Sequence, residues 1–182
     1  MASFRHRIAG DADVPSLIQL MREAIEVNMK AFLSPAEIEA AKETMGVDQT
    51  LIDDGTYFII ETEVSGVTRV VGCGGWGRRR TLYGGNHTEG RDDSLSDPAT
   101  EPARIRAMYT HPDFTRQGVG TLLLELGEDA ARKAGFATIE LGSTLAGEPL
   151  YRARGYLEVD RVTHTGANGE PNVVIRMRKS LL

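Results

Sequence analysis

The segment from Ile105 to Leu124 restricts the possible fold more than any other part of the chain. It reads as a short apolar strand, a turn at Pro112, a loop that contains Gly118 and Gly120, and the start of an amphipathic helix. The N–H groups of such a loop and of the first helical turn have no partner within the helix, and the helix dipole adds partial positive charge there. The segment therefore predicts either an anion-binding site suited to a phosphate group or an ordinary loop-to-helix junction.

The residues that follow complete a strand–helix–strand unit. Lys133 and Gly135 are typical of a helix C-terminus, and residues 137–141 are typical of a short strand. The buried face of the helix is expected over Leu122, Leu123, Leu126, Ala130 and Ala134. Because a strand stands on each side of the helix, residues 104–141 predict a right-handed βαβ unit with two parallel strands.

The rest of the chain carries signals for more helices and strands. A first helix is expected after an N-cap at Asp11 or Asp13, and a second after the capping-box pattern of Ser34 and Glu37, ending near Met45. The other expected elements are strands at 4–8, 57–61, 67–71, 156–162 and 172–178 and a short helix at 148–154. Most neighbouring strands in this list should pair antiparallel.

Length and composition fit one α/β domain over residues 1–182. The net charge of −5 argues against nucleic-acid binding and mildly favours a cationic substrate. Cys73 is the only cysteine and no Cys/His cluster has zinc spacing, so we expect neither an internal disulfide nor a metal. No stretch has the length of a signal peptide or a membrane span, which predicts a cytoplasmic protein that does not act at a membrane.

Two further motifs lack the context that their usual functions need. Residues 72–77 match the Gly-x-Gly-x-x-Gly dinucleotide fingerprint, but residues 78–85 do not read as the helix that must follow it. A glycine-rich strand end is the better interpretation. The tripeptide at 111–113, His-Pro-Asp, also occurs in J-domain co-chaperones, where it lies between two helices, whereas here the preceding residues read as a strand.

The stretch from about residue 78 to residue 102 is polar, aperiodic and long for a loop. It could cover an active site, or it could be a solvated insertion without a role. Its acidic residues Glu89, Asp92 and Asp93 could hold a cationic substrate, and a solvated loop would explain them equally well. The sequence leaves both interpretations open.

The segment 146–156 adds a second motif, in which Tyr151 is followed by three residues, Gly155 and an aromatic residue that opens the next strand. Together with the loop at 115–120, one helix and one strand earlier, it resembles the GCN5-related N-acetyltransferase (GNAT) family. That family usually has Arg/Gln-x-x-Gly-x-Gly/Ala in the loop, and Thr115 departs from this pattern. The resemblance covers residues 4–177, although the insertion at 78–102 is longer than the family pattern suggests.

The resemblance implies a mixed, mostly antiparallel sheet with one parallel strand pair at the cofactor site, flanked by helices. It implies an N-acetyltransferase that moves an acetyl group from acetyl-CoA directly to a primary amine of a small molecule or peptide. The alternative is a non-catalytic acyl-CoA-binding sensor or regulatory module of the same fold. A homodimer, formed through an exposed strand near the C-terminus, is an assembly that the family often adopts.

The resemblance also assigns residues to the site. Tyr151 would donate a proton to the leaving thiolate, and the Met108 N–H would stabilise the oxyanion. The residues expected to contact the cofactor are Met108, Tyr109, Thr110, Thr115, Arg116, Gln117, Gly118, Val119, Gly120, Thr121, Tyr151 and Arg154. The expected reason for Gly118 and Gly120 is that phosphates can approach a backbone that carries no Cβ.

The general base is not evident from the sequence. Many family members have an acidic residue at the position that corresponds to Arg104, and an arginine cannot accept a proton at neutral pH. The remaining candidates are an ordered water and the side chains of Glu61, Glu140, His87 and His111.

Overall fold

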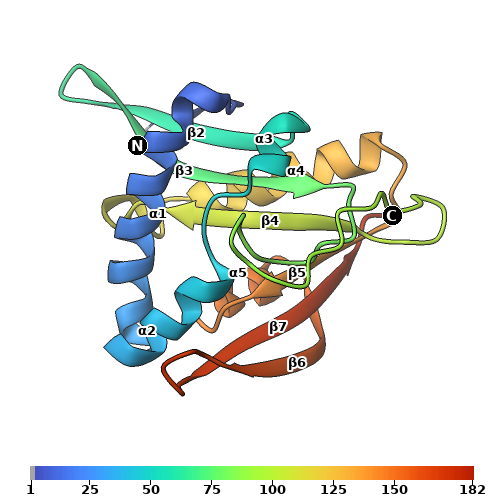
Figure 1. Cartoon of the computed structure of the whole chain (residues 1–182). Helices are drawn as coiled ribbons and strands as arrows, with labels where there is room; N and C mark the ends of the chain where they lie inside the picture. The colour runs from blue at the N-terminus through green and yellow to red at the C-terminus, as the bar shows by residue number, and fades with distance from the viewer. Residues whose placement is uncertain (1–2) are drawn as a thin grey trace.

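The computed structural model describes residues 3–182. These residues form a seven-stranded sheet in the order β1-β2-β3-β4-β5-β7-β6 (Figure 1). The strands are β1 (Arg5–Ile8), β2 (Tyr57–Val64), β3 (Val67–Gly77), β4 (Ala103–Thr110), β5 (Thr138–Ser143), β6 (Leu157–Thr165) and β7 (Pro171–Ser180). The helices are α1 (Val14–Asn28), α2 (Pro35–Ala41), α3 (Gln49–Asp53), α4 (Val119–Lys133) and α5 (Glu148–Ala153), with short 3-10 helices η1 (Asp11–Asp13), η2 (Met29–Ala31), η3 (Lys42–Thr44) and η4 (Pro112–Phe114).

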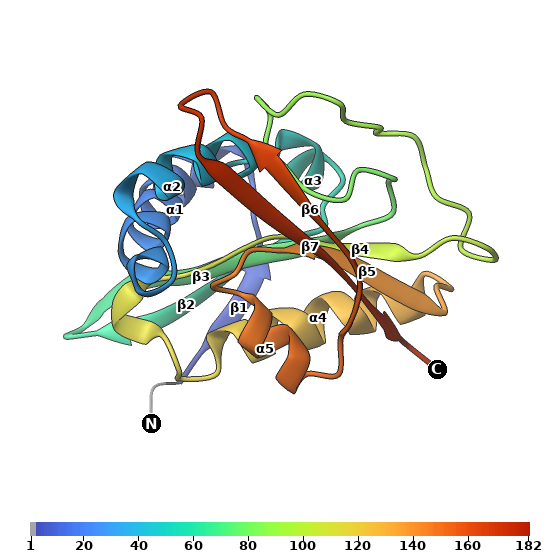
Figure 2. The ribbon, with the colours of Figure 1, turned by 90° about the horizontal axis from the view of Figure 1, so that it is seen from below.

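Helices cover both faces of the sheet. Figure 2 shows α1 and α2 on one face and α4 on the other. Leu17 and Ile25 of α1 pack with Ile59 of β2 in one apolar cluster, while Leu124 of α4 packs with Ile139 of β5 in another. Since each helix buries one apolar stripe against the sheet, the two clusters fix the sheet between two helical layers.

The parallel pair of the predicted βαβ unit is confirmed as β4 and β5, and it is short. Ala103 pairs with Ile139 and Arg104 with Glu140, and no further pairs follow within the described strands. Beyond this point β4 stays paired with β3, and β5 stays paired with β7 as far as Ser143. The two strands therefore separate toward their C-terminal ends.

A bulge in β4 lies where the two strands separate. The register against β3 shifts between Cys73 and Gly75, and Ala107 has a φ of 50°. A positive φ is uncommon for a residue with a Cβ, so this backbone needs support from its surroundings. The buried Tyr57 hydroxyl donates a 2.6 Å hydrogen bond to the Ala107 carbonyl and holds the bulge.

The glycine-rich segment at 72–77 lies inside β3, and no helix follows it. A Cβ on Gly72 would lie 2.4 Å from a Val119 methyl group, and one on Gly74 would lie 2.7 Å from the Met108 side chain. The glycines therefore let the start of α4 and the β4 bulge lie close to β3. The preference for a glycine-rich strand end over a dinucleotide loop is confirmed.

Two predictions about helix boundaries have different outcomes. The capping box at Ser34 is present, because the Ser34 hydroxyl accepts from the Glu37 N–H and the Glu37 carboxylate accepts from the Ser34 N–H. The predicted N-cap bond of Asp13 is absent, because its side chain accepts no hydrogen bond from the first turn of α1. The side chain accepts from the Gly10 N–H and pairs with Arg7, while Asp11 opens the 3-10 turn before α1.

The buried stripe of α4 is displaced from the predicted one. Of the five predicted positions only Leu123 is fully buried, and the other four are partly buried. The helix lies close to the sheet at Gly127, where a Cβ would lie 2.6 Å from Ile105. The fully buried positions of the helix are Val119, Leu123, Leu124, Gly127, Glu128 and Ala131.

The insertion at 78–102 is a long loop (Figure 2) that ion pairs fasten to the body of the protein. Asp48, fully buried, accepts hydrogen bonds from Arg91 of the loop at 3.0 Å and from Arg106 of β4 at 2.8 Å. Arg106 also donates to the Gly84 carbonyl at 2.7 Å. A buried carboxylate shared by two arginines fixes the loop beside β4.

At the other edge of the sheet, β6 pairs with β7 alone among the strands of residues 3–182. Its apolar side chains Leu157, Val159 and Val162 are exposed. Among the helices of the described residues, none combines the length and apolar character that crossing a bilayer requires.

Candidate active site

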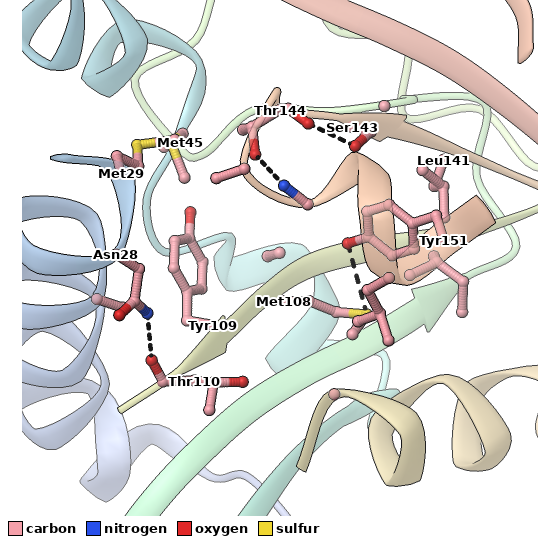
Figure 3. Close-up of a pocket in the computed structure, with 18 of the residues that line it drawn as sticks. Asn28, Met29, Met45, Met108, Tyr109, Thr110, Leu141, Ser143, Thr144 and Tyr151 are labelled. Atoms are coloured by element: carbon pink, nitrogen blue, oxygen red, sulfur yellow. Dashed lines mark hydrogen bonds between the residues drawn. The ribbon is translucent and has the colours of Figure 1, made fainter. Parts of the chain in front are cut away.

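A cavity of about 690 Å³ opens between β4 and β5 where the strands separate (Figure 3). Figure 3 shows Asn28 and Tyr109 on one side of it and Leu141 and Tyr151 on the other. The cavity continues to the start of α4, where Gly118, Val119 and Gly120 line it. One continuous space therefore joins the open strand edge to the helix N-terminus.

The open edge of β4 offers backbone groups to the cavity. The His111 N–H donates to Val71 of β3 at 2.8 Å, so the groups of Thr110 point the other way, toward the separated β5. Met108, two residues earlier, has the same orientation as Thr110. The Thr110 carbonyl accepts from the Asn28 amide at 2.9 Å. The remaining groups can pair with an extended ligand as with an added strand.

Residues 115–121, which we call the cradle, form an anion site at the end of the cavity. Arg116 has a φ of 62° and Gly118, the N-cap of α4, has a φ of 94°. Within residues 3–182 the N–H groups of residues 116–121 have no acceptor, and the first satisfied N–H is that of Leu122, which donates to the Gly118 carbonyl at 2.9 Å. These N–H groups and the dipole of the 15-residue helix favour a phosphate.

The two cradle glycines have different structural reasons. At Gly118 a Cβ would have no protein atom within 4 Å, so its surroundings are open to a ligand and its left-handed backbone is what requires glycine. At Gly120 a Cβ would lie 2.7 Å from a methyl group of Leu150 in α5. Close packing of α4 on α5 is therefore a structural reason for glycine at this position.

Tyr151 is held with its hydroxyl inside the cavity. Its ring meets Tyr156 edge-on at 5.9 Å between centroids, and its carbonyl accepts from the Tyr156 N–H at 3.0 Å. The hydroxyl lies 3.9 Å from the Met108 sulfur (Figure 3). Burial raises the pKa of Tyr151 to about 12, so the hydroxyl carries its proton at neutral pH.

Comparison with known families identifies this arrangement. The model of the acetyltransferase (GNAT) family matches residues 20–156, which include the open strand pair, the cradle and Tyr151. This chain belongs to the GNAT family. The likeness inferred from the sequence motifs and the predicted mixed sheet are both confirmed.

Solved GNAT structures share the fold over nearly the whole chain. A GCN5-related N-acetyltransferase from Rhodopseudomonas palustris is 21% identical, with a TM-score of 0.68 over 99% of this chain and 97% of that one. A Thermoplasma acidophilum N-acetyltransferase in complex with coenzyme A is 15% identical, with a TM-score of 0.61 over 98% and 99%. A Salmonella typhimurium protein solved with its cofactor acetyl-CoA is 18% identical, with a TM-score of 0.61 over 98% and 94%. No curated protein matches this chain.

Most of the predicted GNAT site residues lie together. Gln117 and Arg154 do not line the cavity, because the Gln117 side chain donates to the Asp113 carbonyl at 2.9 Å and Arg154 pairs with Glu125 at 2.9 Å. Thr115, the departure from the GNAT loop pattern, uses its hydroxyl to close the η4 turn at the Pro112 carbonyl. The predicted residues that line the cavity are Met108, Tyr109, Thr110, Thr115, Arg116, Gly118, Val119, Gly120, Thr121 and Tyr151.

Arg104 has a structural partner outside the cavity. It lies 3.3 Å from Glu140, directly opposite it in the parallel pair, and Arg178 of β7 also donates to Glu140 at 2.8 Å. Glu140 is 3% exposed at its side chain and neither residue lines the cavity. Two arginines hold the Glu140 carboxylate outside the cavity lining, so its position does not fit the predicted role of base.

The other predicted bases also lie outside the cavity lining. Glu61 pairs with Arg7 of the neighbouring strand at 3.0 Å. His87 donates to a backbone carbonyl of η3, and His111 lies 2.9 Å from Glu23. The Nδ1 atom of His111 accepts from the backbone two residues on and so caps η4, directly after a strand, which excludes the J-domain arrangement.

The acidic residues of the insertion do not reach the cavity either. Asp93 pairs with Arg91 and accepts from Thr81, and Asp92 accepts from Ser94. The structure therefore gives Asp92 and Asp93 a role in holding the loop, in place of the cation-binding role considered from the sequence.

One wall of the cavity was not predicted from the sequence. We call it the side-chain wall, and it consists of Asn28, Met29, Met45, Tyr83 and Asn172. These residues come from α1, η2, the loop after η3, the insertion and β7. Each segment has only an ordinary local pattern, so no short motif marks the wall.

Proposed function

We propose that this protein is an acetyl-CoA-dependent N-acetyltransferase that transfers an acetyl group directly to a primary amine of a small molecule or peptide. The observation that carries the proposal is the single cavity that joins the unpaired N–H groups of the cradle, the open edge of β4 and the hydroxyl of Tyr151. Acetyl-CoA enters this reaction as a substrate.

The cradle and the open strand edge fit the two constant parts of coenzyme A. The N–H groups of residues 116–121 suit the pyrophosphate, and Gly118 has open space in front of it. The backbone groups of Met108 and the N–H of Thr110 suit the amide groups of the pantetheine arm, which bind as a strand does at a sheet edge. Both contacts use backbone atoms, so they are insensitive to the identity of the exposed side chains.

Chemistry takes place beside Met108 and Tyr151. The amine nitrogen attacks the thioester carbonyl carbon, and the N–H of Met108 stabilises the negative charge that develops on the oxygen. The C–S bond then breaks, and the Tyr151 hydroxyl, 3.9 Å from the Met108 sulfur, donates a proton to the leaving thiolate. A direct attack needs no acetylated side chain as an intermediate.

The side-chain wall is the proposed acceptor site. Its members are neutral, and two of them, Met29 and Met45, are apolar and adaptable. Within residues 3–182 no carboxylate lines the cavity, so the wall offers no charge partner to a polycationic acceptor. This favours an amine on a largely neutral molecule over a polyamine.

Calorimetric titration with acetyl-CoA, followed by an assay of thiol release with a panel of primary amines and peptides, tests the function. We expect binding and acetyl-CoA-dependent acetylation of at least one acceptor. Binding without acetylation of any acceptor would favour the sensor module. Absence of binding would contradict both.

A further inference from the structure

A proton acceptor for the incoming amine is missing from the site as described so far. The titratable side chains of the cavity lining, within residues 3–182, are Tyr83, Arg106, Tyr109, Arg116 and Tyr151. Arginines cannot accept a proton at neutral pH. Tyr109 is buried and its hydroxyl accepts from the Gly46 N–H, while Tyr151 serves the leaving thiolate. Tyr83, which comes from the insertion, is the side chain that remains.

Tyr83 has a basic partner. Its hydroxyl lies 2.7 Å from the Nε2 atom of His164 in β6, and the two rings are 5.9 Å apart at their centroids. When His164 carries its proton on Nδ1, the tyrosine donates to Nε2 and keeps its oxygen lone pairs free. His164 is partly exposed, whereas Tyr83 lines the cavity, so the pair connects the cavity to solvent.

The fold positions Tyr83 against the strand that opens. A Cβ on Gly142 of β5 would lie 3.0 Å from the Tyr83 ring and 3.1 Å from Val174 of β7. Gly142 lines the cavity beyond the last paired rung of the parallel strands, so the ring lies beside the open end of β5. Arg106 holds the backbone at Gly84, next to Tyr83, through a bond of 2.7 Å. The loop is therefore fixed where the tyrosine leaves it.

We infer that Tyr83 and His164 form the route by which the acceptor amine loses its proton, an inference that rests on the proposed function. The ammonium group donates a proton to the Tyr83 oxygen as the phenol proton passes to Nε2 of His164, which leaves a neutral amine and an imidazolium. The nitrogen then attacks the thioester carbonyl. As the C–S bond breaks, the thiolate takes the proton of Tyr151, and the second N–H proton of the nitrogen reaches the Tyr151 phenolate through solvent and restores it.

This route balances the overall reaction. One ammonium proton leaves through His164 to solvent, and the equivalent of a second ends on the sulfur of coenzyme A. Gly142 of β5 lies against the Tyr83 ring, and Asn172 of β7 is the register partner of His164; neither titrates. The charged groups nearby are Arg176 of β7, which is opposite Gly142 and pairs with Asp160, and Arg106 on the loop side, which pairs with Asp48. The insertion then has a chemical role as the carrier of the base.

The test compares Tyr83→Phe and His164→Gln with the unaltered protein. Phenylalanine keeps the ring on Gly142, and glutamine keeps a hydrogen-bonding group but cannot take up a proton. The control is His87→Gln, since His87 lies in the same loop outside the cavity lining. The measurements are kcat/KM for the best primary amine as a function of pH and the acetyl-CoA affinity by calorimetry.

Near neutral pH we expect Tyr83→Phe to lower kcat/KM by about a hundredfold, which is typical of lost general-base catalysis. His164→Gln should lower it less. Both deficits should shrink as the pH approaches the pKa of the amine, because the free amine needs no base. Burial keeps the pKa of Tyr151 at about 12, so that donor stays protonated over the range. Acetyl-CoA affinity and the His87→Gln variant should be unchanged.

A deficit that is the same at every pH, or no deficit, would overturn the inference and leave the acetyltransferase function standing. If the unaltered protein binds acetyl-CoA and acetylates no amine, the proposed function fails, and the inference fails with it. The behaviour of the unaltered protein therefore distinguishes the two failures.

Discussion

The two halves of the cavity present different chemical groups, backbone in one half and side chains in the other. The cradle and the edge of β4 present backbone N–H and C=O groups, while the side-chain wall presents amides, thioethers and a phenol. Backbone groups are the same in every sequence, and side chains vary freely. The difference suggests that the first half serves the constant substrate of the GNAT family and the second half serves the acceptor that distinguishes one member from another.

The largest expected loss of stability comes from a substitution that frees the loop beside the side-chain wall. Asp48→Asn would leave Arg91 and Arg106 without their shared buried partner, and breaking such a pair costs about 3–5 kcal/mol of folding free energy. Denaturant unfolding measures this. At a temperature where the variant is folded, we expect KM for the acceptor to rise while acetyl-CoA affinity stays close to normal.

The matched control is Glu101→Ala, which removes the exposed ion pair of Arg80 in the same loop. Exposed pairs contribute little because water screens them, so only a small change in stability is expected. Equal loss of acetyl-CoA affinity and acceptor binding in the Asp48 variant would mean that the two halves are not separable.

The next largest effect is a loss of turnover that leaves acetyl-CoA binding nearly unchanged. Tyr151→Phe removes only the hydroxyl that donates to the thiolate, so kcat should fall by about a hundredfold, equivalent to about 2.7 kcal/mol. Acetyl-CoA affinity should be nearly unchanged, because the lost interaction forms in the transition state. Steady-state kinetics and calorimetry measure the two quantities. Lower affinity with turnover preserved would contradict the role of proton donor.

A smaller effect is expected where α4 meets α5. Gly120→Val would force a branched side chain against Leu150, which already lies 2.7 Å from the position of a Cβ, and such overpacking costs about 1–3 kcal/mol. We expect weaker acetyl-CoA binding and a lower midpoint of thermal unfolding. The double variant Gly120→Val with Leu150→Ala should restore most of both, and its failure to do so would place the clash elsewhere.

The smallest effect concerns the cradle backbone. Gly118→Ala puts a Cβ on a residue with a φ of 94°, which costs about 1–2 kcal/mol for an ordinary residue. The new Cβ meets no protein atom, so reduced acetyl-CoA affinity would report the strained backbone together with any contact between the Cβ and the phosphate. Gly118→Asn should lose less, because asparagine tolerates left-handed conformations. Calorimetry should rank the affinities as glycine, asparagine, alanine.

The difference between the cradle and the side-chain wall also explains which parts of the site could be predicted from the sequence. The cradle follows from local signals, since Pro112, Gly118 and the apolar periodicity of α4 are close together in the chain. In the side-chain wall, tertiary packing brings Asn28 and Asn172 to the same cavity, and no local sequence pattern predicts that these distant segments line it together. The capping box of Ser34 was predictable for the same reason as the cradle. The displaced stripe of α4 was not, because it depends on the close contact of Gly127 with Ile105.

The pairing of Arg104 with Glu140 has a consequence for how this family member could have diverged. The two residues face one another across the last rung of the parallel ladder, and Arg178 reinforces the pairing. A carboxylate at position 104 would meet the buried carboxylate at 140, and like charges in direct opposition destabilise a strand pair. The two positions should therefore change together, so an acidic residue at 104 would require a change at 140 as well.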